Sequence, residues 1–288
     1  MDEADRQYIK SALDQHGFKF SKSMGQNFLI GANIPEKIAR LSGIDKSCGV
    51  LEVGPGAGAL TKELCRRAGR VSAVELDRRL IPVLKDTLCG YDNVEVIHGD
   101  ILKLDIAGFV GDKMPGMRFH VCANLPYNIT TPAISAFIGA EVFESITVMI
   151  QREVARRICA KPDSADYGAF TVYINYHTEP EILFDVPPEC FMPRPKVVSS
   201  VVTLKTRAVR ALEPDEETLF FRVIRASFAQ RRKTLVNALH ASFGDKLQKG
   251  QIAEVVKDCG FGSNVRGETL GLSDFARLSA EFRKHLQA

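Results

Sequence analysis

The chain has 288 residues, 45% of them hydrophobic and 25% charged, which excludes a largely disordered protein and suits one large folded domain with a smaller one. Its formal net charge of +3 is too small to indicate a nucleic-acid partner by itself. Residues 1–10 are polar and acidic, and no stretch reaches the ~18 uncharged apolar residues of a membrane span. We therefore expect a cytoplasmic protein.

Apolar, β-branched runs alternate with helical patterns between about residue 47 and residue 160. This rhythm is typical of a parallel sheet with crossover helices, so we expect a doubly wound α/β domain. The expected strands are Val50–Val53, Val71–Glu75, Val94–His98, Phe119–Ala123 and Ser145–Gln151.

After Pro162 the pattern changes to strands joined by short connections, which predicts an antiparallel edge to the same sheet. These strands are Tyr167–His177, Glu181–Val186 and Val197–Leu204. The proline-rich stretch 186–195 favours a stiff loop. From Glu216 to the end the pattern is helical, which predicts a small all-α C-terminal domain. We therefore divide the chain into residues 1–206, with a helical extension over about 1–45, and residues 207–288.

The seven cysteines are scattered and never spaced as Cys-x-x-Cys, which argues against a disulfide framework and against a zinc site. The six histidines form no His-x-x-x-His pair and do not cluster with cysteine. We therefore expect reduced thiols and no structural metal.

Three glycines, Gly54, Gly56 and Gly58, lie between the first expected strand and a helix. Because they have no side chains, a ligand can approach their backbone closely, as in nucleotide-binding loops. Glu75 ends the next strand about 20 residues further on, where a carboxylate can accept hydrogen bonds from both ribose hydroxyls. NAD and S-adenosylmethionine both fit this pattern. The alternative is a tight turn with a surface glutamate.

Asp100 follows the third expected strand, at the carboxyl edge where ligands of open α/β folds bind. It can accept a hydrogen bond from the adenine amino group of a cofactor. It can also act as an ordinary helix N-cap, and the sequence leaves both roles open.

Asn124-Leu125-Pro126-Tyr127-Asn128 comes directly after the fourth expected strand, beside the presumed cofactor. An asparagine oxygen and the backbone carbonyl that Pro126 stiffens can accept hydrogen bonds from an adenine amino group and aim its lone pair at a methyl donor. Tyr127 offers a flat face for a flipped-out base, worth about 1 to 3 kcal/mol of stacking. Asn124, Leu125, Pro126 and Tyr127 are therefore the candidate catalytic residues. The alternative is a strand that ends in a Pro-Tyr turn.

Eight segments, in order along about residues 18 to 272, resemble motifs of the KsgA/RsmA family of small-subunit ribosomal RNA adenine dimethyltransferases. They are Lys22–Leu29, Glu52–Gly56, Glu75–Asp77, Asn124–Asn128, Gln151–Val154, Tyr167–Gly168, Phe191–Val197 and Phe228–Thr234. Two departures from the family, at Met24 and Gly267, carry none of the chemistry.

This resemblance implies a Rossmann-like class I methyltransferase sheet with S-adenosyl-L-methionine as the cofactor and S-adenosyl-L-homocysteine as its product. It also implies N6,N6-dimethylation of two adjacent adenosines in the 3′-terminal hairpin of 16S rRNA, within the assembling 30S ribosomal subunit. We expect a monomer, because nothing in the sequence indicates a larger assembly. The expected cofactor contacts, with Gly56 added from the glycine-rich loop, are Asn27, Leu29, Gly54, Gly56, Glu75, Asp100 and Asn124. Phe191 is expected to form a second aromatic wall of the base pocket opposite Tyr127. The alternative is that Phe191 anchors the proline-rich loop to the core.

Residues 206–288 hold 14 Lys and Arg against 10 Asp and Glu, so the positive excess lies at the C-terminal end. Five basic residues fall within twelve positions, a density that suits phosphate contacts with the rRNA. They are Arg222, Arg225, Arg231, Arg232 and Lys233. The alternative is a solvated helix face.

Three other classes of protein compete with this interpretation. An Erm-type methyltransferase of 23S rRNA shares the fold and cofactor, but Phe228–Thr234, with Asn237 and Leu239, favours the KsgA pattern. A non-catalytic nucleic-acid-binding factor on the same fold would be expected to lose Glu75, Asp100 or Asn124. A dehydrogenase has no use for the motif that begins at Asn124.

Overall fold

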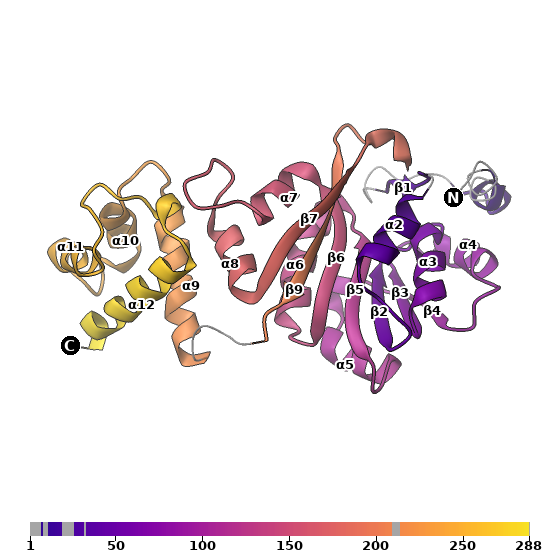
Figure 1. Cartoon of the computed structure of the whole chain (residues 1–288), viewed down its shortest axis with the longest axis horizontal. Coiled ribbons are helices and arrows are strands. Elements are labelled where there is room, and N and C mark those ends of the chain that lie inside the picture. Colours follow the sequence, from indigo (N-terminus) through magenta and orange to yellow (C-terminus); the bar gives the residue numbers. More distant parts are fainter. Residues whose placement is uncertain (1–6, 8–10, 19–25, 32, 209–213, 288) are drawn as a thin grey trace. The chain divides into compact units, whose positions relative to one another are not determined.

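The computed structural model describes residues 7, 11–18, 26–31, 33–208 and 214–287. Met24 lies outside these residues. The chain divides into two compact units (Figure 1): the residues up to Ala155 together with Glu181–Thr206, and Arg156–Pro180 together with the residues from Arg207 on. The predicted division at residue 206 therefore differs from this one, because residues 156–180 belong with the C-terminal helices.

The first unit is built on a seven-stranded sheet in the order β4-β3-β2-β5-β6-β9-β7. Its strands are β2 (Cys48–Val53), β3 (Arg70–Glu75), β4 (Val94–His98), β5 (Arg118–Asn124), β6 (Phe143–Gln151), β7 (Thr178–Val186) and β9 (Ser199–Thr206). The pairs β2/β3, β3/β4, β2/β5 and β5/β6 are parallel, and β9 runs antiparallel to β6. The predicted parallel sheet with an antiparallel edge is confirmed.

The central strands are apolar because helices follow them on both faces of a doubly wound sheet. All six residues of β2 are buried, and Val50 lies opposite Val71 of β3. One core cluster contains Val50 together with Ile38 of helix α2 (Ile34–Leu41) and Leu64 of helix α3 (Ala59–Arg67). Besides these two helices and the helical residues 11–15, the described part of this unit contains α4 (Leu80–Thr87), α5 (Ile106–Lys113) and α6 (Thr130–Gly139). A further helix, α7 (Arg152–Ile158), spans the boundary between the units.

The predicted strand Tyr167–His177 is wrong, because this segment forms helix α8 (Ala169–His177). Its aromatic and β-branched residues favour a strand by propensity, but tertiary packing decides otherwise. Val172 and Tyr176 lie one helical turn apart, and both pack into the core of the second unit. The other two strands predicted at this edge correspond to β7 and β9.

The second unit is helical, as predicted for the C-terminal part of the chain. Its remaining helices are α9 (Pro214–Ala229), α10 (Leu235–Phe243), α11 (Lys249–Asp258) and α12 (Leu272–Gln287). Two tyrosines of the 156–180 segment are bonded to this bundle: Tyr176 Oη donates to Glu217 Oε1 at 2.8 Å, and Tyr167 Oη donates to the Leu270 carbonyl at 2.8 Å. No helix among the described residues is long and apolar enough to cross a membrane.

Candidate active site

The glycine-rich loop turns sharply between β2 and α3. Gly54 and Gly56 have φ of +67° and +62°, in the left-handed region that favours glycine. The N–H of Gly54 donates to the Val74 carbonyl at 2.9 Å, which fixes the loop to the end of β3. A Cβ on Gly56 would lie 3.1 Å from the ring of Phe28. The two glycines therefore line a pocket without side chains that would fill it.

The carboxylate of Glu75, at the end of β3, is held by two backbone donors. Gly56 N–H donates to Oε2 at 3.2 Å and Asp77 N–H donates to Oε1 at 2.8 Å. Glu75 is only 5% exposed, and burial raises its pKa to about 7 although these hydrogen bonds oppose the shift. Each oxygen keeps a further lone pair, so Glu75 can accept hydrogen bonds from hydroxyl groups of a ligand.

A short antiparallel pair joins two distant parts of the chain beside this pocket. Strand β1 (Phe28–Leu29) pairs with β8 (Phe191–Met192), and Leu29 lies opposite Phe191. Asn124 Nδ2 donates to the carbonyl of Asn27 at 3.1 Å. The side-chain oxygen of Asn124 is thus the end of the amide left for a ligand. These contacts bring the segment at residue 27 against the carboxyl edge of the sheet.

The structure does not place Phe191 at the pocket. Its side chain is 3% exposed and packs in the core cluster that contains Leu29 and Cys122. This position corresponds to the alternative role, in which Phe191 anchors the proline-rich loop to the core. The predicted second aromatic wall opposite Tyr127 is absent from the pocket lining of this conformation, within the part of the chain that is described.

The motif at the end of β5 forms a lip on the same pocket. Leu125 is buried and its N–H donates to the Met149 carbonyl at 3.2 Å, so the backbone is fixed where the strand ends. Tyr127 begins a 3-10 turn, Tyr127–Ile129, and its hydroxyl is 2.8 Å from Ser199 Oγ. Burial raises the pKa of Tyr127, and the contact with Ser199 restrains the ring.

Asp100 acts as the N-cap that its sequence position allows, and it also lies in the pocket lining. Its Oδ1 accepts from the N–H of Leu102 at 3.1 Å, as the N-cap of the 3-10 turn Ile101–Lys103. Lys103 Nζ lies 3.6 Å from Oδ2. The residue also lines the pocket, so capping does not remove it from the ligand site.

Together these segments enclose a pocket of about 240 Å³, somewhat below the roughly 300–1,000 Å³ usual for small-molecule sites. The structure brings together here every predicted cofactor-binding and catalytic residue: Asn27, Leu29, Gly54, Gly56, Glu75, Asp100, Asn124, Leu125, Pro126 and Tyr127. They come from five separate segments of the first unit, so the predicted site is one physical cavity.

Glu52 is a pocket residue whose environment the sequence reasoning missed. It lies on β2, is 1% exposed, and its burial raises its pKa to about 8. Neither Glu52 Oε2 nor the nearby hydroxyl of Thr61 has a hydrogen-bond partner among the described residues. A carboxylate inside an otherwise apolar strand is the sequence signal that could have identified it.

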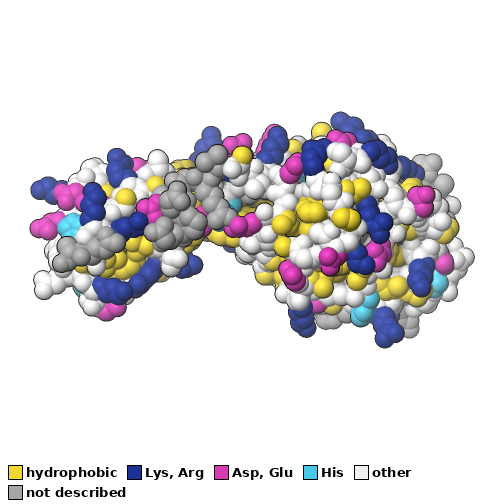
Figure 2. Space-filling model, turned by 90° about the horizontal axis from the view of Figure 1, so that it is seen from below, with side chains coloured by type: hydrophobic (Ala, Val, Ile, Leu, Met, Phe, Trp, Pro, Cys, Tyr) yellow, Lys and Arg dark blue, Asp and Glu magenta, His cyan; other side chains and the backbone are white. Residues whose placement is uncertain are grey.

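The five basic residues predicted to contact rRNA fall into two groups. Arg222 donates to the Ser242 carbonyl at 3.1 Å and lies 4.3 Å over the ring of Phe243, so it fastens α9 to α10. Arg231 donates to Glu268 Oε2 at 2.8 Å and to the Ala165 carbonyl at 2.7 Å. Three exposed residues have side chains with no hydrogen-bond or ion-pair partner in the described part of the chain: Arg225, Arg232 and Lys233. On the face drawn in Figure 2, Lys and Arg side chains are interspersed with Asp and Glu.

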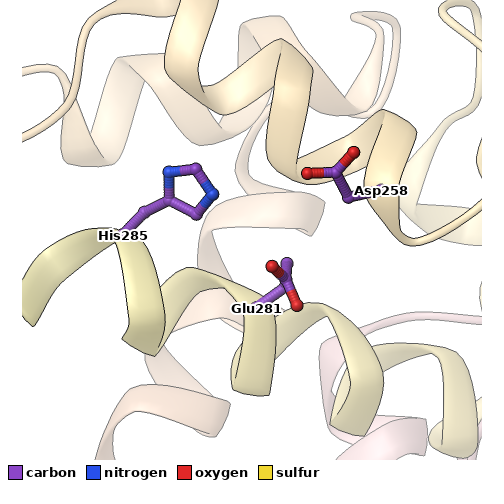
Figure 3. A group of neighbouring side chains, drawn as sticks. All are labelled: Asp258, Glu281 and His285. Carbon is purple, nitrogen blue, oxygen red and sulfur yellow. The ribbon is translucent and has the colours of Figure 1, made fainter. Parts of the chain in front are cut away.

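A separate group of side chains lies on the second unit, where Asp258 of α11 faces Glu281 and His285 of α12 (Figure 3). One possible ligand atom from each lies within 4.8 Å of the others. Glu281 already pairs with Lys284 Nζ at 2.6 Å. Because this ammonium group neutralises the carboxylate, we assign no metal to the group.

The sheet order and the site together define a Rossmann-like methyltransferase. Dinucleotide-binding sheets have six strands in the order 3-2-1-4-5-6, whereas here an antiparallel strand, β9, is inserted between β6 and β7. The family model described as ribosomal RNA adenine dimethylase matches residues 17–274. This chain belongs to the ribosomal RNA adenine dimethylase family.

Relatives and solved structures agree with this assignment. The chain is 47% identical over 269 residues to ribosomal RNA small subunit methyltransferase A of Shouchella clausii, covering 93% of this chain and 91% of the relative. It is 46% identical to the protein of the same name from Geobacillus kaustophilus, and the match covers 94% of this chain and 93% of the relative. A dimethyladenosine transferase from Plasmodium falciparum has a similar structure, with a TM-score of 0.75, 26% identity and coverage of 90% and 98%. The 23S rRNA methyltransferase ErmE is also similar, with a TM-score of 0.70 and 27% identity, and the match covers 89% of this chain and 100% of ErmE.

Proposed function

We propose that this protein transfers methyl groups from S-adenosylmethionine to N6 of two adjacent adenosines in the 3′-terminal hairpin of 16S rRNA. One observation carries the proposal: the side chain of Asn124 and the Leu125-Pro126 backbone lie on the same pocket as the Glu75 carboxylate. An amino-group acceptor and a nucleoside-binding carboxylate are the two parts that this reaction requires side by side.

The residues of the pocket fit S-adenosylmethionine. Both oxygens of Glu75 are oriented by backbone N–H groups and can accept the two ribose hydroxyls. Gly54 and Gly56 leave space where a Cβ would approach Pro126 or Phe28. Asp100 can accept from the adenine amino group, and Asn27 and Leu29 also line the pocket. The bound cofactor supplies an activated methyl group on a positively charged sulfur, which is a good leaving group.

The protein's own contribution to the reaction is positioning. The lone pair of an adenine amino nitrogen is delocalised into the ring, so the nitrogen is a poor nucleophile. Asn124 Oδ1 and the Leu125 carbonyl accept from its two N–H groups and favour a more tetrahedral nitrogen. Pro126 stiffens the carbonyl, and Tyr127, held through Ser199, provides a face for the flipped-out base.

Dimethylation makes a further demand on the lip. After the first transfer the nitrogen has one N–H, so only one of the two acceptors can keep its hydrogen bond. The fixed ends of the lip, at Leu125 and Tyr127, must then hold the base by shape and stacking. The second methylation therefore depends more on Tyr127 than the first does.

The substrate we propose is the 16S rRNA of the assembling 30S subunit, bound by a monomer. The relatives at 46–47% identity are named for the small ribosomal subunit, whereas ErmE, named for 23S rRNA, is 27% identical. The exposed residues Arg225, Arg232 and Lys233 are available for phosphate contacts.

Two measurements test the proposal. Mass spectrometry of the 16S rRNA 3′ hairpin from cells with and without the gene should show two dimethyladenosines that disappear with the gene. The purified protein should transfer labelled methyl groups to immature small subunits. Transfer to 23S rRNA instead would assign the chain to the Erm type, and no transfer to either RNA would overturn the proposed activity.

A further inference from the structure

Asp77 is a buried carboxylate next to the pocket that the proposed mechanism does not use. Its side chain is 3% exposed and it is absent from the described pocket lining. Arg79 donates to it three times: from the backbone N–H to Oδ1 at 3.1 Å, from Nε to Oδ1 at 2.9 Å, and from Nη2 to Oδ2 at 2.6 Å. Its fourth bond comes from a distant segment, since Gln26 Nε2 donates to Oδ2 at 2.9 Å.

The backbone of Asp77 orients the carboxylate of Glu75, which is proposed to bind the ligand. The N–H of Asp77 donates to Glu75 Oε1 at 2.8 Å, and the turn that presents this N–H is closed by the bond from Arg79 N–H to Asp77 Oδ1. The side chain of Asp77 therefore fixes the conformation of the backbone group that orients Glu75.

The bond from Gln26 to Asp77 restrains another part of the pocket wall. Gln26 and Asn27 line the pocket, and the carbonyl of Asn27 accepts from Asn124. The ring of Phe28 packs against Gly56. A bond that restrains Gln26 thus restrains a wall that touches both the glycine-rich loop and the catalytic asparagine.

Arg79 extends the same connection. Its guanidinium lies 5.1 Å over the ring of Phe18, and Phe18 lies 5.6 Å from Phe28, between ring centroids. Asp77 and Arg79 therefore restrain the N-terminal wall by two routes, through Gln26 and through the two phenylalanines. The hydrogen bonds from Arg79 lower the pKa of Asp77 to about 2, so these contacts persist at neutral pH.

We propose that Asp77 is a positioning residue for cofactor binding, which holds the Gln26–Phe28 wall and the Glu75 carboxylate in the geometry that receives the adenosine part of S-adenosylmethionine. This inference rests on the proposed function, because it takes that cofactor as the ligand. A purely structural role predicts a different result: loss of stability without a selective loss of cofactor affinity.

The test compares Asp77→Asn with Asp86→Asn. Asparagine keeps the size of the residue but loses the charge and cannot accept all four bonds. Asp86 is the matched control, because it also contacts the N-terminal segment, through His16 at 2.7 Å, but lies on α4 with its side chain 60% exposed. By calorimetry, Asp77→Asn should raise the Kd for S-adenosylhomocysteine about tenfold, the effect of about one charged hydrogen bond. Asp86→Asn should leave it unchanged.

Kinetics separate positioning from stability. Asp77→Asn should raise KM for S-adenosylmethionine about tenfold while kcat and KM for the RNA substrate change less than twofold. Gln26→Ala leaves the Asp77–Arg79 pair intact and should raise the same KM about fivefold. The double variant should have the same KM for S-adenosylmethionine as Asp77→Asn alone, because both substitutions act on the same bond between Gln26 and Asp77.

The outcomes are distinct. Wild-type affinity in Asp77→Asn, an equal fall in kcat, or additive effects in the double variant would overturn the positioning role. If Asp77→Asn does not fold, Gln26→Ala decides, and its wild-type KM would overturn the inference. A wild-type protein that binds no S-adenosylhomocysteine would instead refute the proposed function.

Discussion

The pocket on the sheet edge and the basic end of α9 were both predicted from clusters of side chains, but the structure holds the two clusters differently. In the pocket, Glu75 and Asn124 are fixed by hydrogen bonds to backbone groups of other segments. In the basic cluster, Arg222 and Arg231 are bonded within the second unit, and only the remaining three side chains have no bonded partner among the described residues. Motifs with fixed spacing therefore predicted residues that lie in one pocket. The density of positive charge, in contrast, predicted a group in which some side chains have structural contacts and others have no partner.

The largest effect is expected in the pocket, from Asn124→Ala. This change removes an acceptor aimed at the reacting nitrogen and also the donor that holds the Asn27 carbonyl. We expect kcat to fall by about a thousandfold, as for the loss of one preorganised hydrogen-bonding group in an active site. Single-turnover methyl transfer to immature small subunits measures it, with thermal unfolding as the control for folding. A fully active variant would refute the mechanism.

The substitution Glu52→Gln tests how the buried carboxyl group of Glu52 affects the stability of the protein. Burial raises the pKa of Glu52 to about 8 from an ordinary value of 4.5. Between these values the unfolded chain ionises while the folded protein keeps the proton, so wild-type stability falls as the pH rises from 4.5 to 8. Above pH 8 the variant should be more stable by up to about 5 kcal/mol, and near pH 4 the two should converge.

Urea unfolding at pH 4, 6 and 8.5 measures this difference. Glu181→Gln, at an exposed position on β7, is the matched control and should show no such trend. A difference between Glu52→Gln and the wild type that is the same at all three pH values would contradict the prediction.

Two variants of Tyr127 distinguish stacking of its ring on the base from anchoring of its hydroxyl to Ser199. Tyr127→Ala removes the ring and should cost about 1 to 3 kcal/mol of base stacking, which corresponds to a fall in kcat/KM for RNA of roughly 5- to 150-fold. Tyr127→Phe loses only the contact with Ser199 at 2.8 Å and should cost less than about fivefold. Counting mono- and dimethyladenosine by mass spectrometry should show monomethyl product accumulating with Tyr127→Ala. Equal effects of both variants would place the role in the hydroxyl.

The smallest effect is expected on the second unit, where it sharpens the contrast with the pocket. Replacing Arg225, Arg232 and Lys233 together with Ala should flatten the dependence of log K on log salt for 30S binding by about 2 to 3, and leave Tm unchanged. Replacing Arg222 and Arg231 with Ala should lower Tm by a few degrees, about 1 kcal/mol, with little change in the slope. The reverse pattern would show that the two buttressing arginines contact RNA.

The sequence predicts what local spacing determines. The five parallel strands and the glycine-rich loop follow from runs of apolar residues and from the positions of Gly54 and Gly56, because a buried parallel strand and a left-handed turn have few other solutions. The end of each strand then places Glu75 and Asn124 on one edge without knowledge of the packing.

The sequence cannot predict which of two partners a side chain meets. Phe191 faces the core because β8 pairs with β1, a contact across more than half of the chain. Residues 169–177 form a helix because Val172 and Tyr176 pack on the C-terminal bundle, which overrides their strand propensity. The internal contacts of Arg231 likewise depend on where Glu268 lies.

The path of the backbone limits how this protein can be divided. The chain crosses from one unit to the other after Ala155, after Pro180 and after Thr206. A cut at residue 206 would strip residues 156–180 from the bundle, and with them the tyrosine hydroxyls that reach Glu217 and Leu270. A chimaera that exchanges the second unit between relatives must therefore transplant both of its stretches at once, since a swap of the tail alone would pack residues 156–180 of one relative against the helices of the other.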